Sequence, residues 1–136
     1  MPTWNASSSR GRVLAVDDSY VMRELVTLSL EAVGYSVEAV ASGDAALVAA
    51  ARENFDAFIL DVDMPGMDGL AVGRALRRDP RTRSSMIAMH TSLDEADVRT
   101  GFDGYNAYLR KPFDARRLGE CVDRMLRDRR LRARDD

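Results

Sequence analysis

Short apolar runs alternate with longer amphipathic stretches along the chain. The runs at 13–16, 57–60 and 86–89 contain no polar residue, which is typical of strands buried on both faces of a sheet. Two further β-like runs lie at 37–41 and 107–109. Strands that alternate strictly with helices favour a parallel sheet covered by helices. The pattern therefore predicts a doubly wound α/β fold with five strands and five flanking helices.

Capping signals mark where the predicted helices begin and end. Ser19 and Ser42 precede amphipathic stretches and are typical N-caps, and Ser92 with Glu95 has the spacing of a capping box. The first of these helices should stop at Gly34. Its predicted apolar face consists of Val21, Met22, Leu25, Leu28 and Ala32.

The chain of 136 residues has the size of one domain. We expect a flexible leader at 1–11, a folded domain at 12–127 and a charged tail at 128–136. The single cysteine, Cys121, cannot form an intramolecular disulfide, and the N-terminus lacks the apolar stretch of a secretory signal. No apolar run approaches the roughly 20 residues needed to span a bilayer. These features predict a cytoplasmic protein, and the net charge of −2 does not favour nucleic acid as a partner.

Polar side chains that could take part in catalysis or ligand binding follow the predicted strands. Asp17 and Asp18 end the first strand, Asp61 ends the third, Thr91 ends the fourth and Lys111 follows the fifth. Ligands of open α/β sheets bind at the carboxyl ends of the strands, so these side chains should share one edge. Taken singly, each Asp could be a helix cap, Thr91 a turn residue and Lys111 a solvated charge. Their common placement favours a shared site.

Three carboxylates at one site repel one another, and their ionised forms are stable together near a cation. Oxygen ligands without clustered His or Cys point to Mg²⁺. One carboxylate could then act as a nucleophile towards a phosphoryl group, while a lysine neutralises charge on the transferring oxygens. A threonine hydroxyl could donate a hydrogen bond to the product phosphate. The pattern therefore predicts phosphoryl-transfer chemistry.

At this point the chain resembles the receiver domains of two-component response regulators, especially the single-domain chemotaxis type. The resemblance covers about residues 12–127. The motifs that carry it are VLAVDDS at 13–19, FILDVDMPGMDGL at 58–70, HTS at 90–92 and YLRKPF at 108–113. It implies a flavodoxin-like sheet with strand order 2-1-3-4-5.

The resemblance also implies roles for the acidic residues. Asp61 would be the phospho-acceptor. Asp18 would bind Mg²⁺ or Mn²⁺ directly, and Asp17 would do so directly or through water. Asp61 itself and the backbone carbonyl of Asp63 would complete the protein's share of the metal coordination.

Lys111 would bind a phosphate oxygen, and its peptide bond to Pro112 would be cis. Thr91 and Tyr108 would form the switch pair: Thr91 turns towards the phosphate and Tyr108 moves inward to fill the vacated space. That movement would repack the face formed by the fourth helix, fifth strand and fifth helix, which partner proteins contact.

The function implied is that of a phosphorylation-activated signalling module. A sensor histidine kinase, a phosphotransfer protein or a small phosphodonor would supply the phosphoryl group, and a downstream protein would receive the signal. We expect no enzymatic activity beyond self-phosphorylation and autodephosphorylation, and no membrane partner. A phosphorylation-dependent dimer is compatible with this scheme, and the chemotaxis layout is an analogy.

Three positions depart from the family pattern. Ser92 stands where the family commonly has Ala, and a larger group there could hinder access to the phosphate. His90 stands where an apolar residue is usual, and it is either a phosphate-site or pH-sensing group or a partly buried histidine at a strand end. The side chain of Asp63 is either a fourth acid of the site or simply solvated.

Other interpretations remain open. Asp61 and Asp63 have the DxD spacing of haloacid-dehalogenase-like phosphatases, although that motif normally follows the first strand of a longer chain. The chain could be the receiver part of a larger regulator or hybrid kinase, or a phosphorylation-independent pseudo-receiver. A nucleic-acid contact could use the arginine-rich end, Arg124, Arg127, Arg129, Arg130, Arg132 and Arg134, but Asp128, Asp135 and Asp136 interrupt it.

Overall fold

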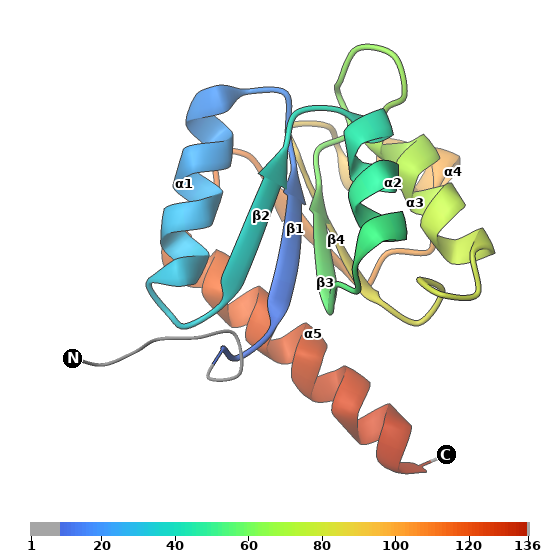
Figure 1. Ribbon diagram of the computed structural model, residues 1–136. Coiled ribbons are helices and arrows are strands. Elements are labelled where there is room, and N and C mark those ends of the chain that lie inside the picture. The colour runs from blue at the N-terminus through green and yellow to red at the C-terminus, as the bar shows by residue number, and fades with distance from the viewer. Residues whose placement is uncertain (1–8, 136) are drawn as a thin grey trace.

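Five parallel strands form a central sheet with helices on both faces in the computed structural model, which describes residues 9–135 (Figure 1). The first eight residues of the predicted leader and the last residue of the predicted tail lie outside the described residues. The elements in chain order are β1 (Arg12–Val16), α1 (Tyr20–Glu31), β2 (Ser36–Val40), α2 (Gly43–Arg52), β3 (Ala57–Leu60), α3 (Gly69–Arg78), β4 (Met86–Thr91), α4 (Glu95–Gly101), β5 (Ala107–Arg110) and α5 (Ala115–Asp135).

The strand order is β2-β1-β3-β4-β5, and every neighbouring pair is parallel. The predicted doubly wound fold and its strand order are therefore confirmed. The order reverses between β1 and β3, so the topological switch point lies where these two strands end. Their register pairs Val16 with Leu60, which brings the next residues of both strands to the same edge.

The core consists of two apolar layers, one on each face of the sheet. Successive residues of a strand point to opposite faces, so Leu14 and Val16 enter one layer while Val13 and Ala15 enter the other. The first layer lies under α2, α3 and α4, and the second lies under α1 and α5 (Figure 1). The three central strands are almost wholly buried, whereas the edge strands β2 and β5 are half-buried.

Two of the predicted helix caps are confirmed. Ser19 accepts a hydrogen bond from the backbone N–H of Met22 at 3.2 Å, and Ser42 accepts one from Ala45 at 3.1 Å. The capping box predicted at Ser92 is wrong, because α4 begins at Glu95 with Asp94 as its N-cap.

The turn between β4 and α4 explains why that capping box does not form. The hydroxyl of Thr91 accepts a hydrogen bond from the backbone N–H of Leu93 at 3.2 Å. The chain therefore turns over residues 92–94 before the helix starts, and the Ser92 side chain is exposed.

The apolar face predicted for α1 is wrong except at Met22, which packs against the core. The buried residues of this helix are Val26 and Leu30, whereas Val21, Leu25 and Leu28 are 64%, 45% and 62% exposed. The helix carries two apolar stripes, since positions 21, 25 and 28 share one face and positions 22, 26 and 30 share another. Packing of α1 against β1, β2 and α5 buries the second stripe.

Helix α5 continues for 21 residues to Asp135 and projects beyond the edge of the sheet (Figure 1). The domain boundary expected near residue 127 therefore falls inside this helix, and the division into leader, domain and tail stays a prediction. Within residues 9–135, none of the helices combines the length and apolar character that crossing a membrane requires.

Candidate functional site

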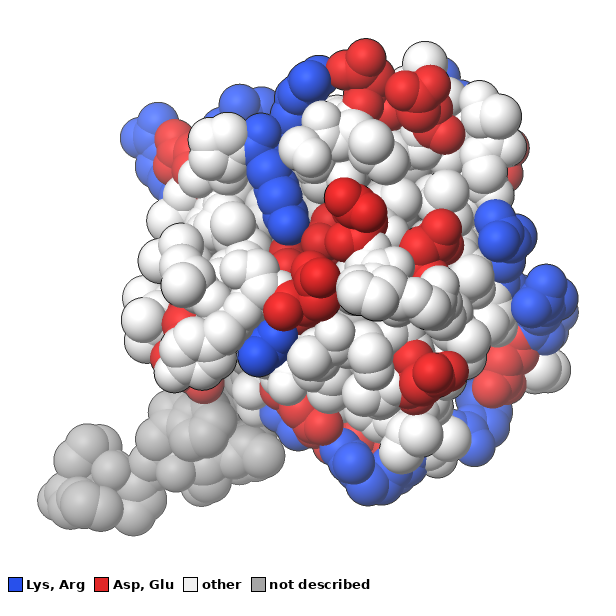
Figure 2. Space-filling view, turned by 90° about the horizontal axis from the view of Figure 1, so that it is seen from above, with Lys and Arg blue, Asp and Glu red and all other residues white. Residues whose placement is uncertain are grey.

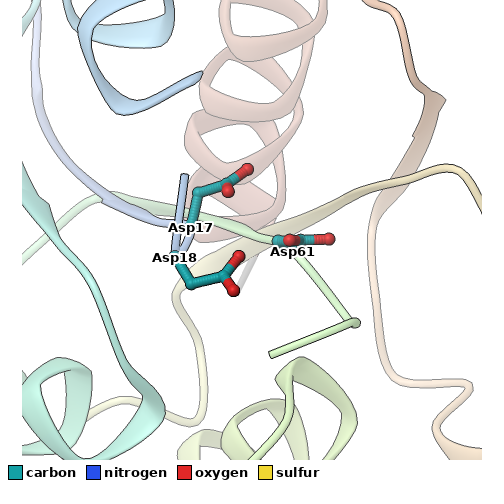
Figure 3. Close-up of side chains that lie close together, drawn as sticks. All are labelled: Asp17, Asp18 and Asp61. Atoms are coloured by element: carbon teal, nitrogen blue, oxygen red, sulfur yellow. The ribbon is translucent and has the colours of Figure 1, made fainter. Parts of the chain in front are cut away.

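The ends of β1 and β3 bring three carboxylates together. The backbone N–H of Asp61 donates a hydrogen bond to Val16 at 2.9 Å, which fixes Asp61 beside the end of β1. Carboxylate oxygens of Asp17, Asp18 and Asp61 lie within 4.8 Å of one another (Figure 3). We call these three residues the acidic cluster. Figure 2 shows acidic side chains gathered in the middle of the face at the carboxyl ends of the strands.

The members of the acidic cluster differ in exposure. Asp17 and Asp61 are each 4% exposed, whereas Asp18 is exposed to solvent. One Asp17 oxygen accepts a hydrogen bond from the backbone N–H of Ser19 at 2.9 Å, so the start of α1 orients this carboxylate. The cluster is therefore a fixed site with one side open to a ligand.

Lys111 reaches the cluster from the end of β5. Its Nζ lies 2.8 Å from Oδ2 of Asp17 and 3.2 Å from Oδ2 of Asp61. Its backbone N–H donates to the carbonyl of Thr91 at 2.9 Å, and its peptide bond to Pro112 is cis, as the resemblance implied. The carboxylates of Asp17 and Asp61 and the ammonium of Lys111 thus form one ion-pair network.

The charges of this network are unbalanced. Burial and the neighbouring Asp17 carboxylate raise the pKa of Asp61, and the ammonium of Lys111 offsets only part of this effect. Burial lowers the pKa of Lys111, but the two carboxylates outweigh it and the pKa is raised overall. Lys111 is therefore protonated at neutral pH and neutralises one of three acids.

The residues of the acidic cluster fit a hard divalent cation. They offer three carboxylates at two adjacent strand ends, with one exposed member through which an ion can enter. Burial and the neighbouring Asp17 raise the pKa of Asp61, and a cation bound beside it would favour the ionised carboxylate. Asp17, Asp18 and Asp61 would hold the ion.

The predicted switch residues meet at one loop residue. Thr91 is fully buried and its hydroxyl accepts from the N–H of Leu93, while the hydroxyl of the half-buried Tyr108 donates to the carbonyl of Leu93. Thr91 and Tyr108 are therefore connected through the β4–α4 loop. Their roles as a switch pair stay a prediction.

Asp63 lies at the rim of the site. Its side chain is exposed, and its backbone N–H donates a long hydrogen bond of 3.4 Å to Oδ1 of Asp61. The role of its carbonyl as a metal ligand stays a prediction.

Gly69 is a part of the site that the sequence did not single out. A Cβ atom at this position would lie 2.1 Å from the carbonyl oxygen of Asp61, so α3 starts in direct contact with the backbone of Asp61. Asp68 caps this helix by accepting from the N–H of Ala71 at 2.9 Å. The signal was available in the sequence, since a glycine follows a capping residue shortly after the strand.

His90 lies behind the site and does not contact the solvent. It is 1% exposed, packs edge-on against Phe113 at 5.2 Å between ring centroids, and its Nε2 has no hydrogen-bond partner among residues 9–135. Burial and the positive charge of Lys111 lower its pKa to about 4. The structure therefore holds His90 as a neutral core residue at pH 7.

We expect His90 to make folding sensitive to mild acid. Its ordinary pKa is 6.5 and its pKa in the folded chain is about 4, so between these values the unfolded chain binds a proton that the folded chain does not. The free energy of unfolding should therefore fall by roughly 3 kcal/mol as the pH drops through this window. Urea unfolding of wild type and His90→Leu from pH 7.5 to 4.5 measures this, since Leu removes the proton site and keeps an apolar group.

The carboxylates titrate in both proteins, so only the difference between their pH profiles reports on His90. Parallel profiles in wild type and His90→Leu would contradict the assignment of a buried neutral imidazole.

The chain is similar to several known proteins. It is 36% identical over 118 residues to the DNA-binding dual master transcriptional regulator RpaA of Synechocystis sp., a match that covers 85% of this chain and 49% of that protein. It is 41% identical over 105 residues to the response regulator PleD of Caulobacter vibrioides, covering 76% of this chain and 23% of that protein. This chain therefore spans about half or less of the length of these curated relatives.

A solved structure agrees over nearly its whole length. The Vibrio cholerae chemotaxis protein CheY4 superposes with a TM-score of 0.81 at 35% sequence identity, and the match covers 85% of this chain and 98% of that one. The family model of the response regulator receiver domain matches residues 13–123, which include the acidic cluster and Lys111. Sequence, fold and site thus agree, and the chain belongs to the response regulator receiver domain family.

Proposed function

We propose that this receiver domain of a two-component system accepts a phosphoryl group on Asp61 and that a divalent cation, Mg²⁺, assists the transfer. The observation that carries this proposal is the position of Asp61. It is buried, it lies within 4.8 Å of two further carboxylates, and its oxygen is 3.2 Å from Lys111. A cation-binding cluster with a lysine beside one acid is suited to phosphoryl transfer.

In the transfer step, a carboxylate oxygen of Asp61 forms a bond to phosphorus. The phosphorus–nitrogen bond of a donor phosphohistidine breaks, and its electron pair stays on the imidazole, which then takes a proton from water. Lys111 is protonated and lies beside the attacking oxygen, so it can hydrogen-bond to a phosphoryl oxygen. The cation, when bound, neutralises charge on the phosphoryl oxygens. Hydrolysis later reverses the modification by breaking the new bond and restoring the carboxylate.

The output of this proposal is a change in a protein-binding surface. Thr91 and Tyr108 both bond to Leu93, so a movement of the Thr91 hydroxyl towards a phosphate on Asp61 would release one of two contacts that hold this loop. The loop leads into α4, and Tyr108 lies on β5. We infer that the face formed by α4, β5 and α5 contacts a downstream protein, and that a sensor kinase or phosphotransfer protein in the cytoplasm supplies the phosphoryl group.

Mass spectrometry of the intact protein tests the transfer and its dependence on a cation. After incubation with acetyl phosphate and Mg²⁺, we expect a mass gain of one phosphoryl group. When EDTA replaces Mg²⁺, the gain should fall by at least about tenfold, because three carboxylates then repel the incoming anion. A folded chain that gains no mass under either condition would be a pseudo-receiver, and a gain of equal size with EDTA would refute the role of the cation.

A further inference from the structure

The loops that precede β4 and β5 lie at the end of the sheet opposite the acidic cluster, near the C-terminal half of α5 (Figure 1). Residues of these loops, of α3 and of α5 line a recess. Its volume is about 600 Å³, and no Asp or Glu lines it. We call it the arginine recess, because four of the residues that line it are Arg77, Arg83, Arg129 and Arg132. This composition favours an anionic ligand.

Arg77 is held rigidly in the wall of the recess by uncharged acceptors. Its Nε donates to Gly104 at 2.9 Å, Nη1 donates to Ser85 at 2.6 Å and Arg83 at 2.7 Å, and Nη2 donates to the side chain of Asn106 at 2.8 Å. All four acceptors are carbonyl oxygens, so the guanidinium is fixed but its charge is not neutralised. Burial and the charge of Arg132 lower the pKa of Arg77, which shows that the positive charges disfavour one another.

The other arginines differ in their partners. Arg129 forms an ion pair with Asp56 at 3.1 Å. Arg83 and Arg132 are exposed, and neither they nor Arg77 pairs within 4.0 Å with a carboxylate of residues 9–132. Within residues 9–132, four arginines and one paired acid therefore leave about three positive charges without a carboxylate partner.

We propose that the arginine recess binds a small molecule with two or three linked phosphate groups, such as a nucleoside polyphosphate or an inorganic polyphosphate. Guanidinium groups match phosphate oxygens in pairs of hydrogen bonds, which the exposed Arg83 and Arg132 can offer. Arg77 uses four of its five N–H donors on carbonyl oxygens, so it contributes its fixed charge and one remaining N–H. A linked phosphate chain supplies the three or more negative charges that the recess lacks. The volume of about 600 Å³ lies in the range of small-molecule sites. A nucleic-acid duplex would instead need a row of cations along a surface.

Calorimetric titration of the whole chain with tripolyphosphate tests the proposal. The titration is done in EDTA and low salt, so that a cation at the acidic cluster does not contribute. We expect saturable binding of one ligand per chain. The double variant Arg83→Gln/Arg132→Gln should weaken it about tenfold or more, because it removes two of the three unpaired charges.

A matched double variant outside the recess distinguishes binding at the recess from nonspecific electrostatic attraction to the whole chain. Arg116→Gln/Arg127→Gln also removes two exposed arginines of the chain, but neither residue lines the recess. It should retain affinity within about twofold. No saturable binding by wild type, or equal losses in the two double variants, would overturn the proposal. Circular dichroism confirms that both variants fold.

Two further ligands identify the source of the phosphates. If ATP binds more tightly than tripolyphosphate and shows the same loss in Arg83→Gln/Arg132→Gln, the recess takes a nucleoside polyphosphate. Equal affinities support recognition of the phosphate chain alone. If duplex DNA binds and loses affinity in Arg83→Gln/Arg132→Gln, while tripolyphosphate does not bind, the surface is a nucleic-acid contact and the proposal fails.

Discussion

Asp61→Asn is expected to abolish phosphorylation by acetyl phosphate and Mg²⁺, with a loss of at least about 100-fold in the phosphorylated fraction formed per unit time. The amide oxygen of Asn is a poor nucleophile, and no other carboxylate in the cluster is placed like Asp61. Ser19 and Lys111 contact the Asp17 oxygens at 2.9 and 2.8 Å, whereas the contacts of Asp63 and Lys111 to Asp61 are longer, at 3.4 and 3.2 Å. Asp18 is open to solvent. Intact mass measured at several times after mixing gives the rate for each protein.

Asp63→Asn is the matched control for this loss. Its side chain is exposed, and the substitution changes the same group two residues away while keeping the backbone carbonyl. We expect it to retain the mass gain. A gain that persists in Asp61→Asn and disappears in Asp63→Asn would assign the nucleophile to Asp63.

Thermal unfolding distinguishes lost chemistry from lost structure in Asp61→Asn. Burial and the nearby Asp17 raise the pKa of Asp61, so its ionised form destabilises the fold without a cation. At neutral pH without Mg²⁺ the Asn variant should unfold at a temperature no lower than that of wild type. A lower temperature would mean that the variant's inactivity reports on folding.

Gly69→Ala is expected to destabilise the domain by about 3–5 kcal/mol. The added Cβ would lie 2.1 Å from the carbonyl oxygen of Asp61 and 2.8 Å from its carbonyl carbon, so the start of α3 would have to move away from β3. Backbone atoms cannot move aside as the end of a flexible side chain can. Urea unfolding of the variant and wild type at pH 7.5 gives the difference in free energy.

Gly66→Ala separates lack of space from backbone conformation. Gly66 has a φ of +73°, but apart from Gly66 and its two chain neighbours no atom of the described residues lies within 4 Å of the position of its Cβ. Its substitution should cost about 1–2 kcal/mol, the penalty for an L-residue in the left-handed region. Equal costs at positions 66 and 69 would contradict a steric role for Gly69.

Predictions from the sequence were most reliable for segments whose hydrophobic pattern is compatible with only one structure. The unbroken apolar runs at 13–16, 57–60 and 86–89 became the three buried central strands, because only a strand covered on both faces hides every side chain. The prediction of buried residues failed where two faces of one helix were equally apolar. In α1 the stripes at Val21 and at Val26 are alternatives of similar hydrophobicity, and the helix buries the second only because α5 and the sheet pack there.

The candidate site was predictable to the extent that it depends on strand ends. Parallel strands place the residues that follow them at one edge, so Asp17, Asp18, Asp61 and Lys111 could be grouped from their positions alone. The interpretation of His90 could not be settled in this way. His90 packs against Phe113 from the segment after β5, and burial together with the charge of Lys111 keeps the imidazole neutral.

By itself the sequence determined the layered α/β fold and the strand edge that carries the acids, because local periodicity and strand ends encode them. Only the tertiary structure decided which stripe of α1 is buried, how closely Gly69 approaches Asp61 and that Arg77 lies with Arg132 in one recess. The physical reason is the same in each case. These features depend on contacts between segments distant in the chain, and the pattern of a single segment carries no information about what packs against it.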